Sequence, residues 1–369
     1  MRILVTGGAG FVGSSLALML NRDLAGVAVC AFDNLRRRGS ELALGRLRKG
    51  GVEFVYGDVR SPDDLAEVGG FDLLLECSAE PSVHAGYDSS PAYVIQTNLV
   101  GTINCLEAAR KHRADVIFLS TSRVYPIGRL RMLPLERHGD RFDVPKASSG
   151  PGWSFDGVTT DFPLSGHRSM YGATKLAAEL LIDEYHAMYG LRTIVNRCGV
   201  ISGPWQMGKV DQGFVVLWAA RHLFGGPLGY VGFGGEGLQV RDVLHVDDLC
   251  DLIRLQVGDF SNCDGAVFNV GGGRERGVSL MELTTMCRDR CGRAISLGHL
   301  PETDRADVPF YLTDNTRITA ASGWVPRRGL GMLLDDIFSW LREHRAMLEP
   351  ILAGTTAAPS PAASGAMTS

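Results

Sequence analysis

Residues 3–20 read ILVTGGAGFVGSSLALML, an apolar run followed by a glycine-rich turn and then a helical stretch. This order of strand, glycine turn and helix is the one that a dinucleotide site requires. Gly8, Gly10 and Gly13 have the usual spacing for such a turn, and Gly7, Gly10 and Gly13 have a wider-spaced variant. The glycines let the backbone approach a pyrophosphate, and the helix N-terminus offers free N–H groups to it. A lone match of this kind is weak, because a plain glycine turn has the same appearance.

The segment that follows adds an acid at the expected place. A second apolar strand, residues 27–32, ends in Asp33, where a carboxylate can hold the two hydroxyls of an adenosine ribose. This predicts NAD as the cofactor. Arg36, Arg37 and Arg38 come soon after and could instead suit the 2′-phosphate of NADP, but the acid at the strand end would repel that phosphate.

Two further segments carry the chemistry. Tyr171 and Lys175 are four residues apart in a helical stretch, so they project from one face. The ammonium favours the phenolate and lowers the tyrosine pKa, and the pair can then remove a hydroxyl proton. The apolar strand 116–119 runs into a cluster of hydroxyls, of which we expect Thr121 to lie beside the nicotinamide. The alternatives are an aromatic residue at the core edge beside a solvated lysine, and a threonine that bonds its own turn.

Apolar strands and helices alternate along the first half of the chain. Strands are expected near residues 2–5, 27–33, 52–56, 71–77 and 115–120. This alternation predicts an α/β fold, a Rossmann-like doubly wound parallel sheet with a smaller C-terminal substrate-binding lobe. Residues 1–196 form mainly the NAD-binding domain, with 126–168 as a substrate-side loop. Residues 197–350 form mainly the substrate lobe, and the Ala- and Pro-rich tail 353–369 is expected to be disordered.

Composition excludes several classes of protein. The 369 residues are 45% hydrophobic and 21% charged with a net charge of −4, so there is no basic footprint for nucleic acid. No apolar run reaches the length of a membrane span, and the first strand leaves no room for a signal peptide, so we expect a cytoplasmic protein. The eight cysteines and nine histidines show no metal-ligand spacing, so no metal is expected. His84 and His167 lie on loops that we place around the substrate.

Together these segments resemble the extended short-chain dehydrogenase/reductase family of nucleotide-sugar epimerases and dehydratases over nearly all of residues 1–345. The resemblance implies a catalytic triad of Thr121, Tyr171 and Lys175. It implies cofactor contacts from Gly7, Gly10, Phe11, Val12, Gly13, Asp33, Asn34, Asp58, Val59, Ser78, Ala79, Glu80, Asn98, Thr121, Tyr171 and Lys175. It implies a nucleotide-diphosphate sugar as substrate, bound by Ser122, Arg123, Gln212, Arg241 and Arg305. For each of the two last arginines, a structural ion pair with a neighbouring aspartate is the alternative.

Within the family, residues 120–125, 161–164, 211–213 and 239–244 are most similar to the branch that inverts carbon 2 of a CDP-linked dideoxyhexose. Dehydratases of the family place an Asp-Glu pair directly after the catalytic threonine, and this chain has Ser122 and Arg123 there. Oxidation and re-reduction need no such acid. The loop 197–204 departs from the family pattern, with Val200 in place of the usual asparagine and Ser202 in place of the usual tyrosine.

The resemblance also implies a mechanism and an assembly. Tyr171 takes the hydroxyl proton, NAD the hydride, and the keto sugar turns in the pocket before it is reduced on its other face. The alternatives are a UDP-sugar 4-epimerase or decarboxylase, a non-catalytic NAD-binding regulator, and a nucleotide-binding scaffold. Helices over 92–111 and 171–189 are expected to pair with those of a second copy, which gives a homodimer or a dimer of dimers.

Overall fold

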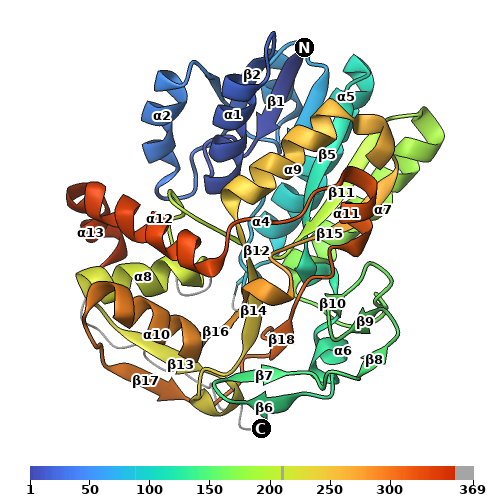
Figure 1. Ribbon diagram of the computed structural model, residues 1–369. Coiled ribbons are helices and arrows are strands. Elements are labelled where there is room, and N and C mark those ends of the chain that lie inside the picture. Colours follow the sequence, from blue (N-terminus) through green and yellow to red (C-terminus); the bar gives the residue numbers. More distant parts are fainter. Residues whose placement is uncertain (88, 209–211, 354–369) are drawn as a thin grey trace, which may run out of the picture.

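The centre of the molecule is a seven-stranded parallel sheet (Figure 1). The computed structural model describes residues 1–87, 89–208 and 212–353, so the predicted contact segment at Asp211 and the tail 354–369 lie outside the described residues. The strands in spatial order are β15 (Ala266–Val270), β11 (Thr193–Cys198), β5 (Asp115–Thr121), β4 (Leu73–Glu76), β1 (Arg2–Thr6), β2 (Ala28–Asp33) and β3 (Glu53–Tyr56). The order reverses between β1 and β4, and ligands of doubly wound sheets bind at such a switch point.

Alternating side chains of each strand enter two different cores. Ile3 and Val5 of β1 face a cluster built with one set of helices, whereas Leu4 between them faces the other cluster. The first set is α1 (Phe11–Asp23), α2 (Ala43–Lys49), α9 (Val246–Gly258) and α11 (Thr316–Ser322). The second set is α3 (Pro62–Glu67), α5 (Gly101–His112) and α7 (Met170–Tyr189). Because both faces are covered, the inner strands are mainly apolar, as the sequence indicated.

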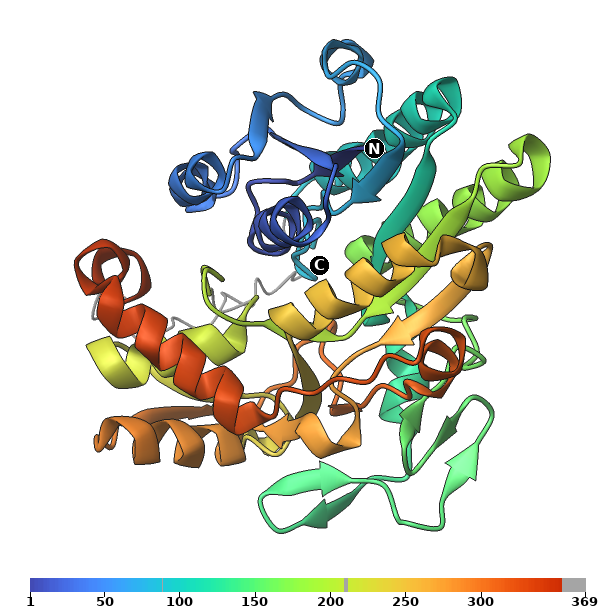
Figure 2. The same ribbon diagram turned by 45° about the horizontal axis from the view of Figure 1, so that its top comes forward.

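A C-terminal lobe packs beyond the carboxyl ends of these strands and has its own apolar core. Its helices are α8 (Phe214–Phe224), α10 (Leu280–Cys291), α12 (Leu330–Glu343) and α13 (Arg345–Leu352). Its strands are β12 (Val200–Ser202), β13 (Leu228–Val231), β14 (Val240–His245), β16 (Gly277–Ser279), β17 (Leu297–Leu300) and β18 (Phe310–Tyr311). Figure 2 shows the sheet domain and this lobe as two bodies of the same molecule.

Residues 126–168 form a small β-rich layer rather than an irregular loop. Its elements are α6 (Ile127–Arg131), β6 (Glu136–His138), β7 (Arg141–Asp143), β8 (Ser149–Gly150), β9 (Trp153–Ser154) and β10 (Gly157–Val158). Val144, Val158 and Phe162 pack against Phe310 and Tyr311 in a fourth apolar cluster. This layer therefore packs against β18 of the lobe, outside the main sheet.

The fold predicted from the sequence is confirmed. Each of the five expected strands is present, with ends that differ by at most two residues from those predicted. The chain also returns to the sheet from the lobe, since β15 pairs in parallel with β11. In the part of the chain that the structure describes, no helix combines the length and the apolar character that a membrane span needs.

Candidate functional site

A cavity of about 920 Å³ lies at the switch point, between the carboxyl ends of the strands and the C-terminal lobe. The structure brings most of the residues named by the sequence to its wall. They are Gly7, Gly10, Phe11, Val12, Gly13, Ala79, Thr121, Ser122, Arg123, Tyr171, Lys175, Gln212 and Arg241. The site therefore joins the glycine turn, the hydroxyl strand end and the tyrosine helix, which are far apart in the sequence.

The glycine turn fits a dinucleotide phosphate. Gly7 has a φ of 63°, and a Cβ there would lie 2.8 Å from the carbonyl oxygen of Cys77. A Cβ on Gly13 would collide with the Gly7 carbonyl oxygen, so the first turn of α1 packs directly on the loop. Gly10 caps α1 without a side chain, which leaves the N-terminal N–H groups of this helix open to a phosphate.

Asp33 ends β2 and supports this turn. Its carboxylate accepts hydrogen bonds from the backbone N–H of Ala9 at 3.1 Å and of Leu35 at 2.7 Å. Burial raises the pKa of Asp33. Asn34 donates to Asp58 at 2.8 Å, and the Arg60 guanidinium lowers the pKa of Asp58 to about 2. These contacts fix the loops on which a ribose and an adenine would lie.

Several of the expected cofactor residues do not line this cavity. They are Asp33, Asn34, Asp58, Val59, Ser78, Glu80 and Asn98, none of which lines the cavity in the described structure. Asn98 is buried, accepts from the backbone N–H of Glu80 at 2.7 Å and donates to its carbonyl at 3.0 Å. Its amide also lies 3.3 Å from Thr174 Oγ1. Asn98 therefore ties the loop after β4 to helix α7.

The catalytic helix α7 begins at an N-cap serine, Ser169, whose side chain accepts from the N–H of Gly172 at 3.3 Å. Tyr171 lies in the first turn of this helix, and a hydrogen bond connects it with Thr121. Burial raises the pKa of Tyr171 to about 12. Thr121 and Arg123 act against this rise, and the lowering of the Tyr171 pKa by Lys175 stays a prediction.

Lys175 is paired with a buried glutamate at the end of β4. Its ammonium Nζ lies 3.5 Å from Oε2 of Glu76 and 3.9 Å from the ring centre of Phe118. The sequence reading did not include Glu76. A signal was present, because a glutamate directly follows the three leucines of a buried strand, where a charge is rare unless it is paired.

On the substrate side, Arg241 is partly buried on β14 and donates to Asp307 Oδ1 at 2.8 Å. Burial lowers the pKa of Arg241 to about 10. Arg123 donates to the carbonyl of Ala306 at 3.3 Å. Arg305 instead lies exposed, with its guanidinium carbon 5.8 Å from the ring centre of Tyr87, and it does not line the cavity. Arg241 therefore forms an ion pair, but with the distant Asp307 and not with the adjacent Asp242 that the alternative named.

Two further arginines, which the sequence did not indicate as site residues, also line the cavity. Arg46 on α2 stacks 4.5 Å from the ring centre of Trp205, and burial lowers its pKa to about 10. Arg221 on α8 has Nε and Nη1 buried without a hydrogen-bond acceptor among the described residues. A Cβ on Gly226 would collide with Arg221, so the glycine gives this guanidinium its space. Neither arginine stands in a motif, so only the folded chain identifies them.

The cavity wall carries an excess of positive charge. The arginines on it are Arg37, Arg38, Arg46, Arg123, Arg221 and Arg241. Among the described lining residues, Asp304 and Asp307 are the carboxylates. Such a wall suits ligands with several phosphate charges.

Residues 126–168, all of which the structure describes, do not line this cavity, so their place in the substrate pocket stays a prediction. Their apolar side chains are used in the separate cluster beneath β14 and β18. His84 does line the cavity, with Nδ1 3.8 Å from Asp304, whereas His167 is exposed elsewhere. Within the described residues, no group of three or more His, Cys, Asp or Glu side chains could hold a metal ion.

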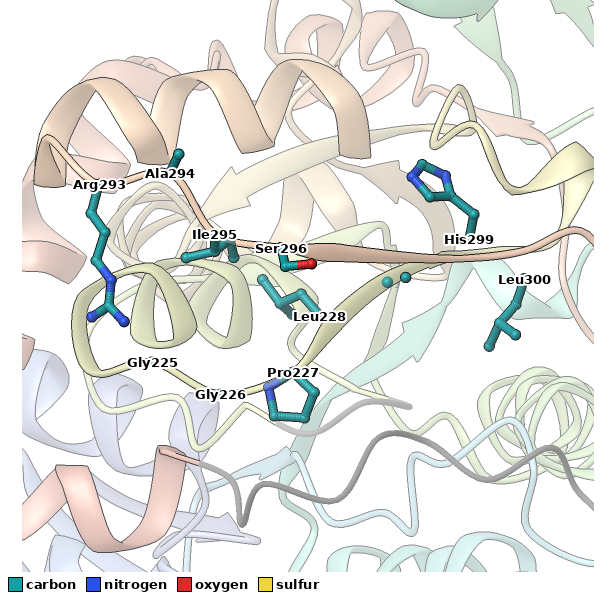
Figure 3. A pocket seen from close by; sticks show the side chains of 12 residues that line it. Gly225, Gly226, Pro227, Leu228, Arg293, Ala294, Ile295, Ser296, His299 and Leu300 are labelled. Carbon is teal, nitrogen blue, oxygen red and sulfur yellow. The ribbon is translucent and has the colours of Figure 1, made fainter.

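A smaller cavity of about 570 Å³ lies beside β13 and β17 (Figure 3). It shares Pro227 and Leu228 with the main cavity but holds none of the catalytic triad. Arg293 and His299 are on its wall, and His299 Nδ1 lies 2.8 Å from the Gly235 carbonyl oxygen. The chemistry of the molecule is therefore placed in the main cavity.

Known proteins share both the sequence and the fold. The model of the NAD dependent epimerase/dehydratase family matches residues 3–271. CDP-paratose 2-epimerase from Salmonella typhi is 30% identical over 349 residues, which are 92% of this chain and 99% of the relative. dTDP-glucose 4,6-dehydratase from Streptomyces niveus is 30% identical over 373 residues, 99% of this chain and 100% of the relative.

Among solved structures, dTDP-glucose 4,6-dehydratase from Streptomyces venezuelae, determined with NAD bound, has a TM-score of 0.77 at 28% identity. The match covers 95% of this chain and 100% of that one. Epimerases and dehydratases thus resemble this chain to a similar degree.

Proposed function

The chain belongs to the NAD dependent epimerase/dehydratase family, and on this premise we propose that it is an NAD-dependent epimerase of a nucleotide-diphosphate sugar. It acts by transient oxidation to a keto sugar and re-reduction. Its reaction is the inversion of carbon 2 in a CDP-linked dideoxyhexose, the reaction for which the Salmonella relative is named.

The observation that carries the choice of epimerisation is the absence of an acid beside Thr121. The two positions after it are Ser122 and Arg123, and both line the cavity. The described carboxylates on the wall are already engaged, because Asp304 accepts from the N–H of Ala306 at 2.7 Å and Asp307 accepts from Arg241 at 2.8 Å. Elimination of water needs a group that protonates the leaving hydroxyl, whereas epimerisation does not.

The arginine-rich wall supports a nucleotide-diphosphate substrate. The described wall has six arginines and two carboxylates, so positive charge is in excess. The dinucleotide and the substrate each bring a negatively charged diphosphate to it. Arg241 stands on the lobe side with its guanidinium held by Asp307, so it is oriented before any phosphate arrives. We assign to it the clamp that holds the nucleotide while the sugar changes its face.

The protein groups then divide the work. Tyr171 removes the proton of the reacting hydroxyl and later returns it, while Thr121, connected with it by a hydrogen bond, orients the reacting oxygen. Bound NAD supplies the hydride acceptor and donor. Lys175 lies one helical turn beyond Tyr171 and directs its ammonium toward the same end of the sheet.

The proposal is tested with purified protein and CDP-paratose, with UDP-glucose and dTDP-glucose as matched alternatives, in deuterated and in ordinary water. We expect inversion at carbon 2 of the CDP sugar with the substrate hydrogen retained at that carbon, observed by NMR. Clean carbon 4 inversion of UDP-glucose, or water loss from dTDP-glucose, without reaction of the CDP sugar contradicts it. Deuterium at the inverted carbon contradicts the hydride route.

A further inference from the structure

Glu76 lies beneath the catalytic helix at the end of β4. Its side chain and that of Lys175 are almost fully buried, each with 1% of the residue surface exposed. Oε2 of Glu76 is 3.5 Å from Lys175 Nζ, and Oε1 accepts a hydrogen bond from the hydroxyl of Ser78. The lysine ammonium also rests on the face of Phe118. The catalytic lysine is therefore held from below by a carboxylate and an aromatic ring.

Burying such an ion pair costs free energy. Taking both charges out of water costs more than most ion pairs return, unless good geometry and further hydrogen bonds compensate. Here Oε2 has no hydrogen bond among the described residues, and a distance of 3.5 Å is long for a direct one. A purely stabilising role is thus a weak explanation for the glutamate.

The titratable groups next to Glu76 and Lys175 are thiols, which add no charge to the pair at pH 7. Cys77 follows Glu76 on the same strand end, Cys105 faces the pair from α5, and Cys198 faces it from β11. Burial raises the pKa of all three thiols, so they are neutral at pH 7. Arg123 acts on Tyr171 from the short 3-10 helix Ser122–Val124 and favours the phenolate. Glu76 acts on the same phenol in the opposite direction.

We propose that Glu76 is a positioning residue of the catalytic pair, whose carboxylate fixes the Lys175 ammonium below the cavity floor and offsets the charge that this lysine presents to Tyr171. This role rests on the proposed function only in taking Tyr171 as the base. It makes Glu76 the group that sets the pH range in which the tyrosine is ready to accept a proton. With the carboxylate in place, the phenol keeps its proton to higher pH.

The test is Glu76→Gln, which keeps the shape and the bond from Ser78 but removes the charge. In NAD-loaded protein with ¹³Cζ-labelled tyrosine, the Tyr171 resonance, assigned by its loss in Tyr171→Phe, should titrate about one pH unit lower than in the parent. A lost negative charge favours the phenolate, so the sign is downward. The acid limb of the kcat/KM profile should move in the same direction.

Glu179→Gln is the matched control, because Glu179 is a second buried glutamate, on α7 one turn after Lys175, and pairs with Arg197 at 2.7 Å. It should destabilise the protein but leave the Tyr171 midpoint in place. A Glu76→Gln protein that is folded, binds NAD and titrates like the parent overturns the proposal. Since the NMR titration needs no substrate, it stands even if the substrate assignment above fails.

Discussion

At the scale of single residues, the pKa of Tyr171 depends on the side chains that surround it at the switch point. Tyr171 is a phenol of ordinary type whose pKa is raised to about 12 by burial, while Thr121 and Arg123 act against that rise. Lys175, four residues on, would be expected to act with them, but its ammonium lies against Glu76. The protonation of the base thus depends on residues from the ends of β4 and β5 and from α7.

The first prediction concerns the base itself. Tyr171→Phe removes the hydroxyl and keeps the ring, so turnover should fall about a hundredfold or more. The fold and NAD affinity should remain, because the ring still fills the same space. Stopped-flow turnover, circular dichroism and fluorescence titration with NAD measure these three properties. If turnover persists in Tyr171→Phe, another group is the base.

The second prediction compares two arginines that the sequence assigned to one role. Arg241→Ala should weaken CDP binding by about 1.5 to 3 kcal/mol, the usual worth of a hydrogen bond to a charged group. Arg305→Ala should change it by less than about 0.5 kcal/mol, because this exposed side chain does not line the cavity. Isothermal titration calorimetry measures both.

Arg241→Ala also leaves Asp307 without its ion-pair partner, which costs stability. Arg241→Lys is therefore made alongside, because it keeps the charge and loses only the planar fork. Equal losses for Arg241→Ala and Arg305→Ala would show that Arg305 moves to the diphosphate when the nucleotide binds.

The proposed catalytic residues could be read from the sequence because each stands in a local pattern that chemistry restricts. Tyr171 and Lys175 have helical spacing, and Thr121 ends a buried strand. Arg46 and Arg221 could not be read in this way, since each acquires its role from a cavity whose other residues are distant along the chain. Glu76 carries a local signal as a charge in a buried strand, but its partner Lys175 is distant along the chain.

At the scale of elements, the five predicted strands are correct because parallel strands covered on both faces are continuous apolar runs. Residues 126–168 gave no such signal. Their strands have two or three residues each, and their order comes from packing on Tyr125, Phe310 and Tyr311. Short hairpins held by remote aromatic residues leave no periodicity to detect.

The third prediction tests the junction of β1 and α1. In Gly13→Ala the new Cβ would collide with the Gly7 carbonyl oxygen, so the turn must open. Overpacking of this kind costs about 1 to 3 kcal/mol, and we expect NAD affinity to fall about tenfold or more. Fluorescence titration with NAD measures the loss.

Gly45→Ala is the control for that change. Gly45 lies in α2, and no heavy atom stands within 4 Å of its added Cβ. This variant should bind NAD like the parent and gain a little stability from the better helix former. Similar NAD affinity in the two alanine variants would show that the turn tolerates a side chain.

At the scale of the whole molecule, the sequence predicted both the sheet domain and the lobe. It did not predict all of the residues of each part that line the common cavity. Arg46 reaches the wall from the sheet domain and stacks on Trp205, whereas Arg221 comes from the lobe. The chain also passes back to the sheet at β15, so the boundary near residue 197 separates the two parts only approximately.

The assembly is the remaining property of the whole molecule, and α7 supplies the argument. This helix packs on α5, yet it exposes Leu180 and Met188 to 64% and 66%. Their spacing of eight residues places both on one side of the helix. Large apolar side chains on one side of a helix favour a partner surface. We therefore propose that a second copy covers this face across a two-fold axis.

The last prediction follows from that face. The parent should be a dimer or a dimer of dimers by light scattering at micromolar concentration, and Leu180→Asp should shift it toward monomer because a buried charge without a partner opposes association. Met332→Asp on α12, where the methionine is 54% exposed, introduces the same charge on another surface and should leave the assembly unchanged. Since α7 also carries Tyr171 and Lys175, separation of the copies should loosen the catalytic helix, and turnover of the Leu180→Asp monomer should fall even though its cavity residues are intact. A monomeric parent, or a Leu180→Asp protein that remains a dimer, would place the interface elsewhere or remove it.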